Sequence, residues 1–155
     1  NNSTDTAKIV TLPISSSTGR NQPLFTLFDI QQKRYYGQSQ NRVNINVPAH
    51  QMRTLLLRQY KKVPLLVGSS FPISDMQIDK IEEHWDSRAH TLTGKITTHQ
   101  NTGMLYVLEP PGFRVSAAVS DKKSLTWTRD ENVVIIKLDP TQDKTVHWTI
   151  AFTRS

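Results

Sequence analysis

The end of the chain alternates between apolar side chains and polar or small ones. In residues 145–153, apolar side chains occupy every second position, namely Val146, Trp148, Ile150 and Phe152. A period of two indicates a β-strand with one buried face and one face in water. The same pattern recurs along most of the chain between clusters of turn residues. The sequence therefore predicts an all-β protein, a two-sheet antiparallel β-sandwich of roughly ten short strands.

The expected strands are short and regularly spaced. They cover residues 8–14, 24–30, 43–47, 52–60, 77–85, 90–98, 104–108, 114–119, 125–128, 133–138 and 146–152. Residues 24–30 are almost continuously apolar, which is typical of a strand buried on both sides. Residues 33–40 are ambiguous, and residues 52–58 also fit a helical pattern. Residues 61–76 contain two prolines and a glycine and are interpreted as a crossing segment between the two halves of the domain.

The length of 155 residues predicts one domain that can bury a sizeable core. Residues 1–6 are polar and are expected to form a disordered tail, and residues 7–155 a single sandwich domain. No apolar run approaches the roughly 20 residues that span a bilayer, so no membrane partner is expected. Cysteine is absent, which excludes disulfides and thiolate metal sites. Because the chain begins with Asn1, we expect a processed protein or a fragment of a longer one.

A hairpin is expected around Trp85. If residues 86–89 form a four-residue loop, Trp85 lies opposite His90 and Glu83 lies opposite Leu92. This register places Glu83 on the apolar face of the hairpin. Glu83 then sits at the rim, has a partner such as His90, or is shifted outward by a bulge. The sequence leaves these three alternatives open.

No catalytic constellation is visible. Glycosidic hydrolysis needs two carboxyl groups across a cleft, but most acidic residues lie beside turns or other charges, as Asp75, Asp79, Glu82, Glu83, Asp86, Asp130 and Glu131 do. Asp29 lies inside an apolar strand, where an edge position or a hydrogen-bonded core acid is favoured over catalysis. The five histidines form no helical metal motif, and the chain has neither a nucleophile elbow nor a phosphate-binding glycine loop. We therefore expect no enzyme activity, no metal site and no cofactor.

Exposed aromatic rings are the best candidates for ligand binding. Sugar-binding sandwiches use Trp and Tyr rings as platforms for the apolar face of a pyranose. Trp85 and Trp148 are assigned to the core, and Trp127 is the most plausible exposed tryptophan, although packing is favoured there too. Tyr35 and Tyr36 lie in a polar stretch, so at least one ring faces outward if this stretch is a strand. The candidate ligand-binding residues are Trp127, Tyr35 and Tyr36.

The formal net charge is +6 and the pI is near 9.7. A basic domain can bind nucleic acid or another polyanion. Here the cations form scattered pairs, at residues 33–34, 61–62 and 122–123. No basic stripe and no aromatic RNA-binding motif accompanies them. The charge pattern therefore favours a solvated mixed surface over a nucleic-acid partner.

Several short segments resemble a known family when their order and spacing are taken together. The segments are Leu55-Leu56-Leu57-Arg58, Pro64 to Ser70 with Ile73, Trp85-Asp86, Leu92-Thr93-Gly94 and Pro110-Pro111-Gly112-Phe113. In this order they resemble the C-terminal β-sandwich of melibiase-like (α-galactosidase-like) glycoside hydrolases. The resemblance covers roughly residues 22–152.

In such enzymes the two catalytic aspartates lie on a preceding (β/α) barrel, so the resemblance transfers no catalytic residue. It implies a non-catalytic accessory domain that packs on the catalytic domain of the same or a partner polypeptide. It also implies a bacterial protein in the periplasm or outside the cell. This hypothesis predicts an apolar patch on one sheet that is exposed in the isolated domain. The alternatives are a free-standing carbohydrate-binding module and a basic-surface binder of polyanions or nucleic acid.

Overall fold

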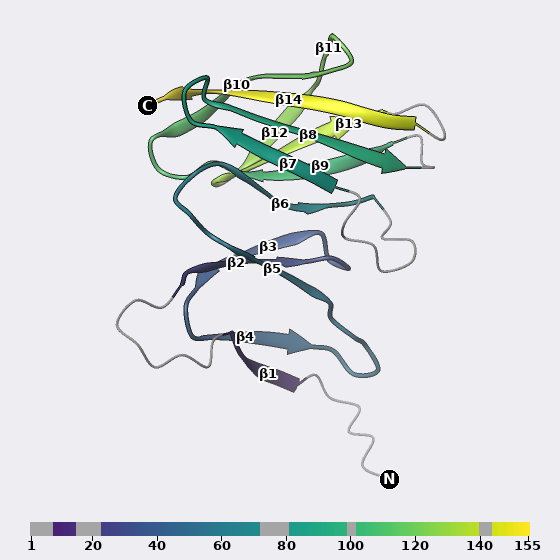
Figure 1. The fold of residues 1–155 in the computed structure, drawn as a ribbon. Helices are drawn as coiled ribbons and strands as arrows, with labels where there is room; N and C mark the ends of the chain where they lie inside the picture. Colours follow the sequence, from purple (N-terminus) through teal and green to yellow (C-terminus); the bar gives the residue numbers. More distant parts are fainter. Residues whose placement is uncertain (1–7, 15–22, 72–80, 99–101, 140–143) are drawn as a thin grey trace. The chain divides into compact units, whose positions relative to one another are not determined.

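The computed structural model describes residues 8–14, 23–71, 81–98, 102–139 and 144–155. These residues form antiparallel strands joined by turns, and no helix occurs among them (Figure 1). The all-β prediction is therefore confirmed. The chain divides after Lys61 into two compact units, which are described one at a time. The expected tail at residues 1–6 lies outside the described residues, and the single domain over residues 7–155 stays a prediction.

In unit 1, which spans residues 1–61, residues 8–14 and 23–61 form two small antiparallel sheets. Its strands are β1 (Lys8–Pro13), β2 (Phe25–Asp29), β3 (Arg34–Ser39), β4 (Arg42–Val47) and β5 (Leu55–Gln59). Strands β1 and β4 pair as a two-stranded ribbon, and β2 is the central strand of the sheet β3-β2-β5. The ambiguous residues 33–40 and 52–58 thus contain strands rather than a helix, since β3 and β5 both pair with β2.

Strand β2 is the buried centre of unit 1. Thr26, Leu27, Phe28 and Asp29 are each at most 1% exposed. A strand with neighbours on both edges and cover on both faces reads as a continuous apolar run, so the expected burial on both sides is confirmed. Asp29 is the exception in this run, since it brings a carboxyl group to a fully buried position.

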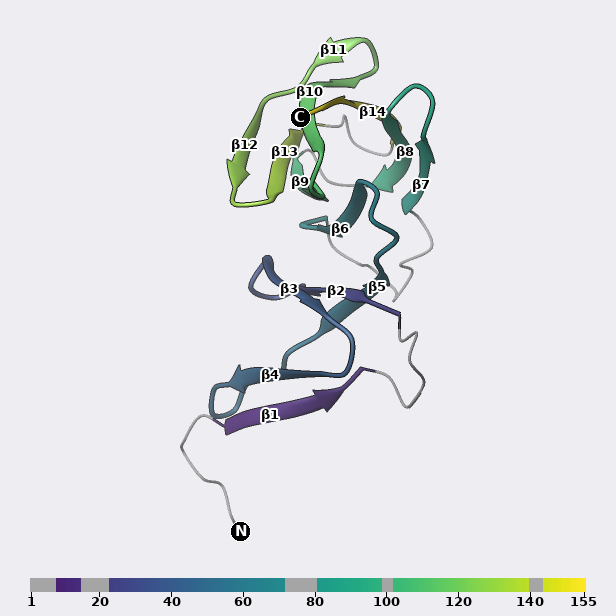
Figure 2. The same cartoon turned by 90° about the vertical axis from the view of Figure 1, so that its left-hand side faces the viewer.

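The described residues of unit 2, which spans residues 62–155, form nine strands in two antiparallel sheets. They are β6 (Leu65–Ser69), β7 (Ile81–Asp86), β8 (Thr91–Thr98), β9 (Gly103–Leu108), β10 (Phe113–Ser120), β11 (Lys123–Ser124), β12 (Trp127–Asp130), β13 (Val133–Leu138) and β14 (Lys144–Arg154). The strand orders are β11-β10-β14-β8-β7 and β12-β13-β9-β6 (Figure 2). Unit 2 therefore has the predicted two-sheet architecture, while unit 1 contributes two further small sheets.

The alternation at the chain end accounts for the core of unit 2. The four apolar side chains of β14 are buried, and they join a cluster that includes Leu105 and Ile136 of the other sheet. Gly94 on β8 lies opposite Trp148 in the sheet. A Cβ atom at Gly94 would lie 2.2 Å from the Trp148 ring and 2.5 Å from the carbonyl oxygen of Glu82. Only glycine gives the indole room at this position.

The interpretation of residues 61–76 as a crossing segment missed strand β6, which pairs with β9 in the four-stranded sheet. Pro64 directly precedes this strand, where a missing amide donor does no harm. Gly68 follows a register shift between Leu66 and Gly68. Such a bulge tolerates glycine, so residues that suggested a break mark the start and a bulge of a real strand.

The expected hairpin at Trp85 exists, but its predicted register was wrong. Trp85 pairs with Leu92 instead of His90, because the four-residue loop covers residues 87–90. The carboxylate oxygen Oδ1 of Asp86 accepts hydrogen bonds from two loop amides at 2.8 and 3.1 Å. His90 closes the loop with a positive φ of 50°. Asp86 is thus the last residue of β7, and the loop begins at residue 87 instead of the expected residue 86.

Of the three alternatives for Glu83, a position at the rim, a partner or an outward shift by a bulge, the structure shows a partner. This partner is not His90. The Oε2 atom of Glu83 accepts a hydrogen bond from the backbone N–H of Leu66 at 3.0 Å. Glu83 lies on β7 and Leu66 on β6, which belong to different sheets. The half-buried carboxylate therefore links the two sheets of unit 2 and provides an acceptor near the bulge of β6.

Candidate functional site

The three candidate ligand-binding residues lie in different units. Trp127 begins β12 in unit 2, whereas Tyr35 and Tyr36 lie in β3 of unit 1. The structure therefore brings the two tyrosines together on one strand and places the tryptophan on another sheet. Each location also contains a buried carboxylate with an arginine partner, and the two surroundings are described in turn.

Trp127 lies on the edge strand of the four-stranded sheet. It is 36% exposed and pairs with Ile136, which in turn pairs with Leu105. Both partners are fully buried in the core. Since residues in one row of a sheet share a face, the indole is on the core side of the sheet but at its open edge. Part of the ring is packed and part is accessible to a ligand.

Arg129 lies two residues further along the same face of β12, at a rise of about 6.6 Å. Its Nε and Nη2 atoms donate to the carboxylate of Glu109 at 2.8 and 2.9 Å. Nη1 of Arg114 donates to the same carboxylate at 2.9 Å. The Glu109 side chain is completely buried, while the side chains of Arg129 and Arg114 are 41% and 52% exposed. We call Glu109, Arg114 and Arg129 the Glu109 cluster.

The Glu109 carboxylate has strong donors on both oxygens. Besides the arginines, the backbone N–H of Val115 donates to Oε1 at 2.6 Å. Burial acts to raise the pKa of Glu109, but the hydrogen bonds from Arg129, Val115 and Arg114 outweigh burial and hold the pKa below its ordinary value. The cluster fastens the end of β9 to the start of β10 and to the edge strand β12. Its chemistry is that of a structural clasp.

Glu109 was missed by the sequence reasoning. The signal was present, because Leu105, Val107 and Glu109 continue one alternating face of β9 into the core. The glutamate directly precedes Pro110-Pro111, a pair that indicates a turn instead of a continued strand. A carboxylate that occupies the next core position of an apolar strand needs a cationic or backbone partner, and this requirement could have identified it.

Tyr36 occupies a β-bulge in unit 1. Leu27 pairs with Gly37 and Phe28 pairs with Tyr35, so Tyr36 has no partner residue across the strands. Gly37 has a φ of 92°, a conformation that favours glycine. A bulge of this kind redirects a side chain relative to the regular alternation. Consecutive tyrosines can therefore both be half-buried, as the structure shows.

The hydroxyl of Tyr36 belongs to a polar network that ends at Asp29. It lies 2.7 Å from the side-chain amide of Gln32. When the amide nitrogen of Gln32 faces Tyr36, its oxygen faces Arg53 and accepts hydrogen bonds from both terminal nitrogens of Arg53, at 2.9 and 2.7 Å. Arg53 Nη1 lies 3.7 Å from Asp29 Oδ2, and the backbone N–H of Gln32 donates to Asp29 Oδ1 at 2.8 Å. Arg34 lies over the Tyr36 ring at 5.5 Å. We call Asp29, Gln32, Tyr36 and Arg53 the Asp29 cluster.

The hydroxyl of Tyr35 is buried and interacts with the side chains of Gln38 and Tyr60. The oxygen is buried and makes no hydrogen bond of ordinary geometry among the described residues. Burial raises the pKa of Tyr35 to about 12, and the nearby side chain of Gln38 offsets only part of this effect. Of the two tyrosines, Tyr36 is therefore the one whose hydroxyl forms a hydrogen bond of ordinary geometry.

Both buried carboxylates have partners that stabilise the fold. The side chains of Asp29 and Glu109 have no solvent-exposed surface, and each has an arginine beside it. A buried acid of this kind is compensated by charge and hydrogen bonds. Among the described residues, no group of three or more His, Asp or Glu side chains could hold a metal ion. Asp29 is thus a hydrogen-bonded core acid, one of the two interpretations that the sequence favoured over catalysis.

No protein-family model and no curated protein sequence matches this chain. Within the described ranges, no helix is long and apolar enough to cross a lipid bilayer. The site that the geometry offers is the half-exposed Trp127 ring beside the exposed guanidinium groups of the Glu109 cluster.

Proposed function

We propose that this chain is a non-catalytic accessory β-sandwich domain associated with carbohydrate processing, which packs on a glycoside hydrolase catalytic domain or partner. The observation that supports the proposal is that the resembling segments beyond residue 61 fall in the two-sheet unit 2, while Leu55-Leu56-Leu57-Arg58 lies in β5 of unit 1. Residues 64–70 contain β6, residues 85–94 contain the loop of the β7–β8 hairpin with the adjoining strand ends, and residues 110–113 lead into β10.

Residues from separate resembling segments also contact one another. The rings of Trp85 and Phe113 meet edge to face with centroids 5.4 Å apart, a favourable geometry for aromatic pairs. Gly94, from a third segment, gives room to the Trp148 ring. Such contacts give these residues a packing role in the sandwich, and this role supports the proposal.

A surface for a partner is available on the ribbon of unit 1. All six residues of β1 are exposed, and Ile9 is 75%, Val10 37% and Leu12 37% exposed. Among the described residues, β1 pairs only with β4, and no described strand pairs with its other edge. An exposed apolar edge strand is a favourable place for another chain to dock. We propose that the catalytic domain covers this ribbon.

The test begins with the natural reading frame upstream of Asn1. We expect a barrel-sized segment with aspartates at strand ends, and the longer protein is then compared with the present chain by hydrogen exchange. The amides of β1 should become protected in the longer protein, while those of the central strand β14 serve as the internal control and should not change. A frame without such a segment, or a β1 that exchanges equally in both proteins, contradicts the proposal.

The exposure of Trp127 favours a second candidate, a free-standing carbohydrate-binding module. An indole at an open sheet edge can stack on a pyranose while the nearby guanidinium groups bind hydroxyls. This function requires saturable binding in a tryptophan-fluorescence titration and loss of that binding in Trp127→Ala without loss of folding. Tyr36→Ala reports whether unit 1 contributes. A flat titration across galactosides, arabinosides and plant polysaccharides would exclude this candidate.

A further inference from the structure

The boundary at Lys61 separates the charges of the chain very unequally. Residues 1–61 contain eight Lys and Arg against two Asp, whereas residues 62–155 contain eleven Lys and Arg against eleven Asp and Glu. The entire formal net charge of +6 therefore belongs to unit 1, and unit 2 is neutral. A strong charge asymmetry between parts of a chain is typical of proteins that bind polyanions.

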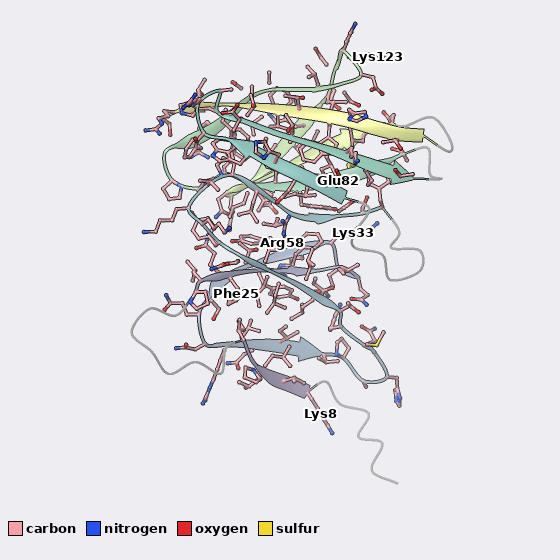
Figure 3. All side chains as sticks on the ribbon, viewed as in Figure 1. Lys8, Phe25, Lys33, Arg58, Glu82 and Lys123 are labelled. Atoms are coloured by element: carbon pink, nitrogen blue, oxygen red, sulfur yellow. The ribbon has the colours of Figure 1, made fainter. Side chains whose placement is uncertain are left out.

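Burial increases this asymmetry at the surface. Of the two acids of unit 1, only Asp29 falls among the described residues, and it is 0% exposed beside Arg53. The described surface of unit 1, residues 8–14 and 23–61, therefore presents no carboxylate side chain. It does present five exposed cations, which are Lys8, Lys33, Arg34, Arg42 and Lys61. Figure 3 shows Lys8 extending away from its strand.

Four of the five exposed cations lie toward opposite ends of the three-stranded sheet. Lys33 and Arg34 are at the turn that begins β3, while Arg42 follows the turn at its other end. Lys61 lies near the same end as Arg42. It follows the end of β5, where Gln59 pairs with Phe25 of β2, and Phe25 also pairs with the last residue of β3. A six-residue strand spans about 17–20 Å, about twice the Debye length of roughly 8 Å at physiological salt. One small anion cannot neutralise both ends, whereas an extended polyanion can.

The rest of the surface favours a sugar polymer over a nucleic acid. Exposed amide side chains accompany the cations, among them Gln31, Asn41, Asn44 and Asn46. Amides can donate to and accept from the hydroxyl groups of sugars. Proteins that bind single-stranded nucleic acid present aromatic rings on which bases stack. The described aromatic residues of unit 1 are all at least partly buried, so they do not form such a platform.

We propose that unit 1 binds an acidic polysaccharide through its exposed lysine and arginine side chains. The proposal does not rest on the accessory role of the sandwich, because it derives from the charge, burial and spacing of unit 1 alone. The guanidinium of Arg42 and the ammonium groups of Lys33 and Lys61 would bind carboxylate groups along the polymer. The neighbouring amides would bind its hydroxyls.

The experiment measures binding of the full chain to polygalacturonate by calorimetry, with neutral galactan and a short duplex DNA as comparisons. The test variant is Lys33→Gln/Arg42→Gln/Lys61→Gln. The control variant, Arg88→Gln/Lys122→Gln/Lys123→Gln, removes the same charge from exposed positions of unit 2. The two triples are matched in backbone strain, because Lys33 and Lys122 both have positive φ values, 54° and 69°. Lys8→Gln/Arg34→Gln is a second test variant if the first does not fold.

We expect polygalacturonate to bind at low salt with an affinity that falls steeply as salt rises, and galactan not to bind. The unit 1 triple should weaken binding about tenfold, at roughly 0.5 kcal/mol for each exposed ion pair. The unit 2 triple should change it by no more than about twofold. The proposal is overturned if polygalacturonate does not bind at low salt, if both triples weaken binding equally, or if duplex DNA binds as tightly as polygalacturonate.

Discussion

Removing the Glu109 carboxylate should destabilise unit 2 by several kcal/mol. In Glu109→Ala the backbone N–H of Val115 loses its acceptor, and a buried donor without a partner costs about 1–3 kcal/mol. Arg114 and Arg129 lose their ion pairs as well, but their side chains are about half exposed. Water can solvate them, so each contributes only up to about 1 kcal/mol. The expected loss in the free energy of unfolding is about 2–4 kcal/mol.

The matched control is Glu82→Ala. Glu82 also pairs with a cation, Lys95, at 2.8 Å, but its side chain is 65% exposed. Its removal should cost at most about 0.5 kcal/mol. Urea unfolding at pH 7 measures both variants by the shift in midpoint at constant slope. Equal effects of the two substitutions would refute the reasoning, because they would show that burial of the carboxylate contributes nothing.

The same clasp predicts a pH dependence. Because the pKa of Glu109 is held below its ordinary value in the fold, the ionised carboxylate stabilises the fold at all pH values above the unfolded pKa of about 4.3. This stabilisation is lost as the pH falls below that value and through the folded pKa. The difference between the wild-type chain and Glu109→Ala should therefore narrow on acidification below about pH 4. A difference that stays constant from pH 7 to pH 3 would contradict the assignment.

Two further substitutions test the packing of each unit. Gly94→Ala should cost about 3 kcal/mol or more in urea unfolding, since the new Cβ would meet both the Trp148 ring and the backbone carbonyl of Glu82; a neutral result would show that the sheet adjusts there. Tyr35→Phe should be neutral or slightly stabilising at pH 7, because it removes a buried hydroxyl without a hydrogen bond of ordinary geometry. Since burial raises the pKa of Tyr35 to about 12, the wild-type chain should lose stability above about pH 10, where the unfolded tyrosine ionises. A Tyr35→Phe variant that loses as much stability as the wild-type chain above pH 10 would count against this assignment.

The local patterns of the sequence predicted strands well and pairings poorly. The alternation before Phe152 predicted β14 because burial of one face imposes a period of two. For the Trp85 hairpin, the predicted loop length was correct and the predicted register was wrong. The hydrogen bonds from the loop amides to Asp86 place the loop one residue later, and they form only in the folded turn. The sequence could not predict the partner of Glu83 either. The N–H of Leu66 lies in another sheet, and no local pattern encodes that contact.

The boundary between the units changes the meaning of the charge pattern. In the sequence the cation pairs at residues 33–34, 61–62 and 122–123 look evenly scattered, and the middle pair straddles the boundary. The two units differ little in how densely they carry cations, so the asymmetry arises from where the acids lie. Unit 2 neutralises its cations with an equal number of carboxylates, whereas unit 1 has two acids and buries Asp29. A mixed surface and a basic one therefore coexist in a single chain, and we expect a polyanion to prefer the basic one.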